Sequence, residues 1–155
     1  MNTKTNENRI PIPKSDEFIS NCEWFRAVHE TVNADIVFAS VSALEAIQYF
    51  NGCIGETTVF VYGNKSLEDM FENIVVIGEE INIEDIEEAR GVKFTSFNRT
   101  LIDMLYEEKY MQAFVEALSY YYYTHEEKFD GLNIPDDVKE KFNYYADVAI
   151  HYYDN

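Results

Sequence analysis

The sequence predicts an α/β (α+β) protein with a small mixed sheet of about four strands, flanked by helices and followed by a helical C-terminal third. Short segments rich in β-branched and aromatic residues recur between Asp35 and Thr95, as buried strands require. From Phe97 onward, apolar residues recur three and four positions apart, which is the period of amphipathic helices. We expect residues 1–14 to form a flexible tail and residues 15–155 a single domain.

The N-terminal half is expected to alternate helices and strands. Ser15 would cap a first helix whose apolar face comprises Phe18, Cys22, Phe25 and His29, with Trp24 and Val28 at its border. His29 is expected to be a packed histidine, because Asn33 occupies the second histidine position of a His-Glu-x-x-His zinc motif. Strands are expected at 35–39, 57–62 and 73–77, a helix at 42–50 that ends at Asn51-Gly52, and a helical turn at 67–71.

A fourth strand and a central helix are predicted between Gly91 and Tyr106. Residues 92–95 suit a strand, and Ser96 is a good N-cap for the helix that follows. The core face of that helix would comprise Phe97, Leu101, Met104 and Leu105. Arg99 and Asp103 fall on its opposite side in the weaker order for an isolated helix, with the cation nearer the N-terminus. We therefore expect Arg99 to have its partner elsewhere.

Two further helices are predicted after a break at 107–109. In the first, at 110–123, Tyr120 and Tyr123 would project on the side that carries Gln112, Glu116 and Ser119. Exposed tyrosines beside polar groups suit a protein interface, although two half-exposed packing rings would give the same pattern. Pro135 would open the last helix, with a core stripe of Val138, Phe142, Tyr145, Ala149 and Tyr152. Asp147 and His151 would form a weak surface pair.

The charge of the chain argues against direct binding to nucleic acids. The sequence has 29 acidic and 12 basic residues, a formal net charge of −17, and phosphate backbones should be repelled. Residues 67–90 are especially acidic, and the run continues through Glu79, Glu80, Glu84, Asp85, Glu87 and Glu88. Such a run is either an ordinary solvated face or a surface that meets a basic partner.

The sequence lacks a recognisable catalytic, metal-binding or cofactor-binding motif. Its histidines and cysteines have no metal-ligand spacing, and three acid-x-Lys strings resemble a nuclease metal site only superficially. We therefore expect no metal and no cofactor, and an enzyme is the third-ranked interpretation. Cys22 and Cys53 are far apart, and neither a signal peptide nor a long apolar segment is visible. We expect a cytoplasmic protein, bacterial or phage-encoded, that makes no contact with a membrane.

Three short motifs follow one another along the chain. They are Ser40-Val41-Ser42-Ala43-Leu44, the strand Thr58-Val59-Phe60-Val61, and Gly91-Val92-Lys93-Phe94-Thr95 followed by Arg99-Thr100-Leu101-Ile102-Asp103. In this order they resemble the S-x-x-S-A-L helix start, the strand and the later segment of the C-terminal domain of AbiEi-type antitoxins of type IV toxin–antitoxin systems. The resemblance covers residues 34–122.

The resemblance implies a toxin-neutralising domain. Family members usually carry a winged-helix DNA-binding domain before this region, and about thirty residues leave no room for one here. The implied partner is a nucleotidyltransferase-like toxin encoded nearby, bound by an acidic, tyrosine-bearing surface. Arg99 and Asp103 would either hold the domain together or form part of that contact.

A second function fits the charge of the chain. Seventeen excess negative charges match about 29 Å of duplex at one charge per roughly 1.7 Å, which is comparable with the width of a globule of this size. The alternative is therefore a phage or mobile-element inhibitor that mimics DNA, such as an anti-CRISPR or anti-restriction protein. The oligomeric state is not predicted.

Overall fold

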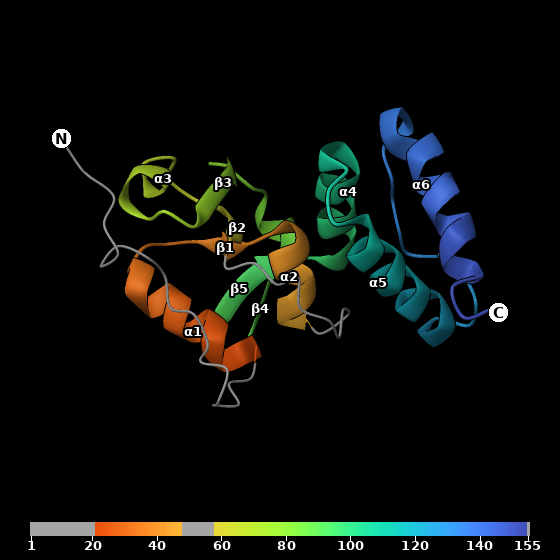
Figure 1. Cartoon of the computed structure of the whole chain (residues 1–155), viewed down its shortest axis with the longest axis horizontal. Helices are drawn as coiled ribbons and strands as arrows, with labels where there is room; N and C mark the ends of the chain where they lie inside the picture. Colours follow the sequence, from red (N-terminus) through yellow and green to blue (C-terminus); the bar gives the residue numbers. More distant parts are fainter. Residues whose placement is uncertain (1–20, 48–57, 155) are drawn as a thin grey trace.

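The sheet contains five short strands within the part of the chain that is described. A computed structural model describes residues 21–47 and 58–154. The strands are β1 (Val37–Phe38), β2 (Val59–Tyr62), β3 (Ile74–Gly78), β4 (Ile86–Ala89) and β5 (Val92–Thr95), in the spatial order β3-β2-β1-β5-β4 (Figure 1). The pairs β1·β5 and β2·β3 are parallel, whereas β1·β2 and β4·β5 are antiparallel. The predicted mixed sheet is confirmed, with five strands instead of about four.

The strand that the sequence did not predict is β4. Its four residues, Ile-Glu-Glu-Ala, combine an acidic pair with low strand propensity, so neither periodicity nor composition marks a strand. The position of β4 is instead determined by the hairpin turn that joins it to β5. Arg90 and Gly91 both have positive φ, 53° and 83°, as a two-residue type I′ turn requires, and they pair Ala89 with Val92. β4 therefore forms because the turn brings it alongside β5, with which its backbone pairs.

One face of the sheet is covered by helices α1 (Asn21–Val32) and α2 (Ser40–Ile47). On α1 the buried residues are Phe25, Val28 and Val32, and His29 is only half-buried. The predicted face, with His29 central and Val28 at the border, is thus rotated: the real stripe follows the spacing i, i+3, i+7. Helix α2 begins two residues earlier than predicted. Several predicted features lie outside what the structure describes: the tail, the cap at Ser15, Phe18, the side chain of Cys22, the helix end at Asn51-Gly52, and Cys53.

The opposite face of the sheet carries a thinner cover. There Val37, Ala39 and Tyr62 form a small buried cluster with Ile77, Ile81 and Ile86. These isoleucines belong to β3, to β4 and to the segment between them, which includes a short 3₁₀ turn, η2 (Ile83–Asp85). The short helix α3 (Leu67–Met70) lies beside β3 at the edge of the sheet (Figure 1).

The C-terminal third is helical, as predicted. It contains α4 (Phe97–Glu107), α5 (Met111–Thr124) and α6 (Asp136–Ile150), which lie together at one end of the molecule (Figure 1). Helices α5 and α6 run in the same direction, because Phe114 packs on Tyr145 while the Tyr123 hydroxyl, farther along α5, donates to the Ile150 carbonyl. Residues 125–135 therefore return along the pair, and Phe129 of this segment packs on Phe142.

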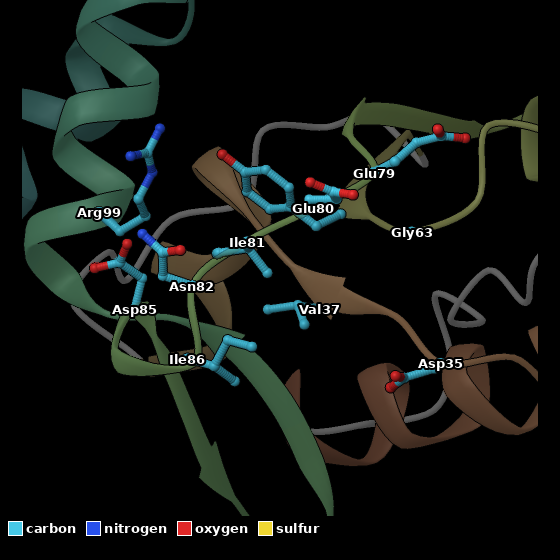
Figure 2. Close-up of a pocket in the computed structure, with 11 residues that line it drawn as sticks. Asp35, Val37, Gly63, Glu79, Glu80, Ile81, Asn82, Asp85, Ile86 and Arg99 are labelled. Atoms are coloured by element: carbon cyan, nitrogen blue, oxygen red, sulfur yellow. The ribbon is translucent and has the colours of Figure 1, made fainter.

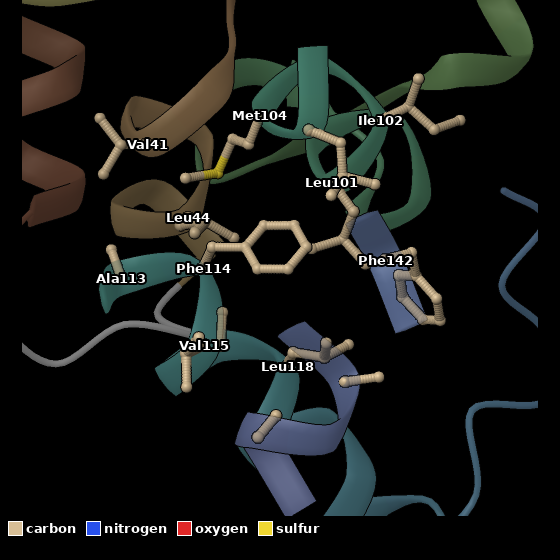
Figure 3. Close-up of a cluster of buried hydrophobic side chains, with 14 of the residues drawn as sticks. Val41, Leu44, Leu101, Ile102, Met104, Ala113, Phe114, Val115, Leu118 and Phe142 are labelled. Carbon is tan, nitrogen blue, oxygen red and sulfur yellow. The ribbon is translucent and has the colours of Figure 1, made fainter. Parts of the chain in front are cut away.

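A second apolar core joins these helices to α2. Phe114 is fully buried at its centre (Figure 3), and its neighbours in the cluster include Val41, Leu44, Leu101, Met104, Leu118 and Phe142. The predicted core face of α4 is confirmed for Leu101, Met104 and Leu105, with Phe97 partly buried. On α6, Val138, Phe142 and Ala149 are buried, and Tyr145 and Tyr152 pack at the margin.

Two predicted surface features of the helical part are wrong. Ser119 was expected on the exposed side of α5, but it is fully buried, and its hydroxyl has no hydrogen-bond partner among the described residues. Helix α5 is covered on more than one side, so periodicity alone does not identify its solvated face. His151 pairs at 2.8 Å with Asp154, which lies just past the end of α6, rather than with Asp147.

The cap of α4 gives a test of local stability. The Ser96 hydroxyl accepts a hydrogen bond from the Arg99 amide at 3.2 Å, so Ser96→Ala should lower the free energy of unfolding by about 1 kcal/mol. Ser66 occupies the same position before α3 without a side-chain cap bond, and Ser66→Ala is the matched control. Urea denaturation measures both. Equal effects would show that the Ser96 hydroxyl does not stabilise α4.

A half-buried glutamate makes stability depend on pH. Burial raises the pKa of Glu45 on α2 from 4.5 to about 7. The folded protein therefore holds a proton that the unfolded chain releases, so this contribution to stability is complete below pH 4.5 and is lost as the pH rises through about 7. Glu45→Gln should remove this dependence, at most about 1.4 kcal/mol per pH unit, in a series of urea denaturations. Glu126→Gln, at an exposed position, should leave the dependence intact.

Candidate functional site

Arg99 and Asp103 belong to a three-residue network that joins α4 to the sheet. The Arg99 guanidinium donates to Asp103 Oδ1 from Nη2 at 2.6 Å and from Nε at 3.1 Å. The Tyr62 hydroxyl, at the end of β2, lies 3.0 and 2.9 Å from the two oxygens of the same carboxylate. Arg99 was expected to have its partner outside its own helix, but its ion pair is with Asp103 of the same helix, and Tyr62 of β2 adds a weaker interaction with the guanidinium. Asp103 also bonds to Tyr62, because its side of α4 faces the end of β2 rather than solvent.

Burial sets the electrostatics of this network. Asp103 is 6% exposed, and loss of solvent raises the pKa of its carboxyl, an effect that the hydrogen bonds and charge of Arg99 oppose. The charge of Asp85 adds to the rise. Burial, followed by the neighbouring Asp103 charge, raises the pKa of Tyr62 to about 12. Tyr62 is therefore a neutral donor at physiological pH, and the guanidinium provides the positive charge.

The residues around this network are held by buried hydroxyl groups. Thr95 and Thr100 share a hydrogen bond of 2.6 Å between their hydroxyls, which ties the end of β5 to the first turn of α4. The Ser42 hydroxyl accepts a hydrogen bond from the Phe60 amide at 3.1 Å, which ties α2 to β2. The motifs at 40–44 and 91–103 therefore lie on elements that pack together, and most of their polar side chains are internal. Arg99 differs, with 31% of its side chain exposed.

The exposed side of Arg99 lines a cleft of about 680 Å³ (Figure 2). The cleft lies over the thinly covered face of the sheet. Its apolar residues include Val37, Ile81 and Ile86, and its four carboxylates are Asp35, Glu79, Glu80 and Asp85. In Figure 2, Arg99 lies at the α4 side, with Asp85 and Asn82 below it and Glu79 and Glu80 across the opening. A cleft that combines apolar side chains with carboxylates can receive a long basic side chain, because such a chain has an apolar stem and a charged head.

The structure brings part of the predicted site together. Arg99, Glu79, Glu80 and Asp85 share the cleft, and Asp103 lies directly behind it. Glu84, Glu87 and Glu88 are exposed on η2 and β4, next to the cleft, and Glu88 also lines a second hollow with Lys93 and His29. The structure adds two residues that the sequence analysis missed, Asp35 and Tyr62. Their signal was weak: Asp35 only precedes a strand, and Tyr62 ends a strand that reads as wholly apolar.

The predicted residues of α5 lie elsewhere. Tyr120 and Tyr123 are 47% and 43% exposed, as expected, and Glu116 is half-buried on the same helix. The Tyr123 hydroxyl donates to the Ile150 carbonyl at 2.9 Å, and its ring packs on Tyr153. Tyr123 therefore contributes to the contact between α5 and the end of α6. The α5 residues and the acidic cleft do not form one site.

Removal of Arg99 tests what the network contributes to stability. Arg99→Ala leaves the Asp103 carboxylate buried without its cation, and we expect a loss of about 2 kcal/mol near neutral pH. The loss should shrink as the pH falls, because a protonated Asp103 needs no opposite charge and its pKa is already raised. Urea denaturation at neutral and acidic pH measures both effects.

The matched control is Lys141→Ala, which removes a cation from an exposed ion pair with Glu108. This variant should lose less than about 1 kcal/mol. If Arg99→Ala costs no more than Lys141→Ala at neutral pH, Arg99 does not stabilise the buried carboxylate.

Residues 21–47 and 58–154 contain no group of three His, Cys, Asp or Glu side chains arranged to hold a metal ion. Within the same ranges, each helix is too short or too polar to span a membrane. Comparisons with protein-family models, with curated proteins and with solved structures gave no match to this chain. The likeness to AbiEi-type antitoxins therefore rests on the motifs at 40–44, 58–61 and 91–103.

Proposed function

We propose that this chain is a non-enzymatic protein-binding protein that docks a basic partner. Its biological role would be that of an AbiEi-like antitoxin, or an inhibitor derived from one, that neutralises a nucleotidyltransferase-like toxin. The observation that carries the proposal is the charge of the cleft. Four acidic residues line the cleft, and Arg99, the one cation among its described lining residues, is already paired with Asp103.

The balance of charge in the cleft selects the kind of group that it binds. Arg99 Nη2 and Asp103 Oδ1 are 2.6 Å apart, so the two side chains together contribute little net charge to the cleft. Lys93 approaches Asp35 at 3.6 Å, and the carboxylate of Glu79 accepts the Lys65 amide. The carboxylates of Glu80 and Asp85 have no hydrogen-bond or ion-pair partner among the described residues. An incoming lysine or arginine would restore the balance there, with its stem against Ile81 and Val37.

The charge of the whole chain supports the same kind of partner. A net charge of −17 attracts a basic surface over distances near the Debye length and raises the rate of encounter. The cleft then provides the specific contact, since buried complementary charges determine orientation more than they determine rate. The resemblance to AbiEi antitoxins supplies the class of partner.

Charge reversal in the cleft tests this function. Tagged protein expressed in the native host or a close relative should co-purify a nucleotidyltransferase at low salt, identified by mass spectrometry. Glu80→Lys should reduce the affinity for that partner at least about tenfold, because it places a cation where the partner's cation docks. Glu140→Lys makes the same change of charge at an exposed position on α6 and should retain the partner. Equal behaviour of the two variants would exclude the cleft as the docking site.

The exposed acidic residues between β3 and β5 also favour the second function, DNA mimicry. Glu84, Glu87 and Glu88 continue the negative surface from the cleft onto β4. Recovery of a nuclease or CRISPR effector in the same experiment would favour the mimic. In that case DNA or RNA should compete for the enzyme, and the affinity should fall steeply with salt. Binding that is insensitive to salt and leaves the nucleic acid in place would exclude mimicry.

A further inference from the structure

The outer edge of β4 presents backbone groups without a partner among the described residues. β4 is the last strand in the order β3-β2-β1-β5-β4. Its turn pairs Ala89 with Val92, so residues 87 and 89 exchange hydrogen bonds with β5, and the bond from the Ser96 amide to the Asp85 carbonyl continues this alternation. The backbone groups of Ile86 and Glu88 consequently point away from β5. The Ile86 amide bonds the Ile83 carbonyl, which leaves the Ile86 carbonyl and both groups of Glu88 at the edge.

The other edge of the sheet is protected. On β3, the Val76 amide donates to the Glu68 carboxylate of α3 at 2.8 Å. A side chain thus satisfies the backbone where an added strand would bind. Proteins commonly guard an edge strand in this way, because free backbone groups are a template for another strand. The contrast between the two edges singles out β4 as the place where a strand can be added.

The side chains of β4 select the occupant. Glu87 and Glu88 point to opposite faces of the strand, and Glu84 and Asp85 precede them. Lys93 lies opposite Glu88 on β5, whereas Glu87 lies opposite the apolar Phe94. A second copy of this strand would place glutamates against glutamates, which is unfavourable across a strand pair. A segment with lysine or arginine on both faces would instead meet opposite charges.

We propose that β4 binds an extended basic segment of the partner protein by strand addition. This inference rests on the proposed function and specifies how the basic partner is held. Asp85 and Ile86 line the acidic cleft and lead directly into β4 (Figure 2), so the strand edge and the cleft are continuous. A segment paired with Glu88 can therefore extend past Ile86 and place its next basic side chain in the cleft. Backbone hydrogen bonds would provide affinity and the carboxylates would provide selectivity.

A pair of substitutions at one position separates backbone pairing from charge. Glu88→Gln and Glu88→Pro remove the same carboxylate, but only proline also removes the outward amide. Proline is compatible with this position because the Glu88 amide is outside the β4–β5 ladder, and edge strands tolerate proline there. The probe is a synthetic peptide in which pairs of adjacent lysines alternate with pairs of valines, so that both faces of the extended peptide carry lysine, titrated at low salt by calorimetry. Relative to the unchanged protein, we expect the affinity for the peptide to fall less than about threefold in Glu88→Gln and at least about tenfold in Glu88→Pro.

Nuclear magnetic resonance on the unchanged protein gives a second measurement, which does not depend on how Glu88→Pro folds. Peptide binding should slow hydrogen exchange at the Glu88 amide and give cross-strand contacts from the peptide to Ile86 and Glu88. If the peptide binds without protecting that amide, or binds Glu88→Gln and Glu88→Pro equally, strand addition is wrong. If Glu80→Lys still weakens binding of the partner in that case, the proposed function stands although strand addition does not. A peptide that fails to bind the unchanged protein also overturns the inference, while the co-purification experiment judges the function separately.

Discussion

Asp103 carries a carboxylate into the interior, and the arrangement of the site depends on how that charge is satisfied. It is the one acidic or basic residue in the buried set of the described chain. An unpaired carboxylate in such a position would cost several kcal/mol. The Tyr62 hydroxyl and the Arg99 guanidinium satisfy it from two directions, one from the sheet and one from the same helix. Helix α4 is thereby held against the end of β2, and Arg99 is held at the mouth of the cleft.

The cleft itself follows from the unequal cover of the two sheet faces. Helices α1 and α2 bury one face, where large side chains such as Phe25 of α1 pack on Phe38 of β1. The other face is covered by only a few isoleucines, which belong to β3, to β4 and to the segment between them. The segment between β3 and β4 contains no long helix, so it fills less of the space above this sheet face than a packed helix would. The remaining space opens to solvent beside Arg99, and the acidic residues of that segment line it because they cannot be buried.

The sequence predicted the elements whose patterns are local. Helices α4 and α6, the cap at Ser96 and the apolar strands β2 and β5 all have a periodicity or a capping residue that depends on neighbours in the chain. Prediction from the sequence failed where the position of a residue depends on an element that is distant along the chain. β4 exists because β5 pairs with it, Ser119 is buried by packing from more than one side, and Asp103 faces inward because Tyr62 meets it. The candidate site was therefore half predictable: its acidic residues are visible in the sequence, but their convergence on Arg99 is not.

Glutamates at the two sheet edges show that acidic composition alone does not define a binding surface. On β3, Glu68 folds back and satisfies a backbone amide, so its charge serves the protein's own structure. On β4, the side chains of Glu87 and Glu88 are exposed, and the outward amide and carbonyl of Glu88 have no partner within the described part of the chain. The tyrosines of α5 lie at the other end of the molecule, and Tyr123 is engaged with α6 (Figure 1). The proposed binding surface therefore lies where carboxylates are not used internally. In the described part of the chain, that place is the cleft and the strand that leads out of it.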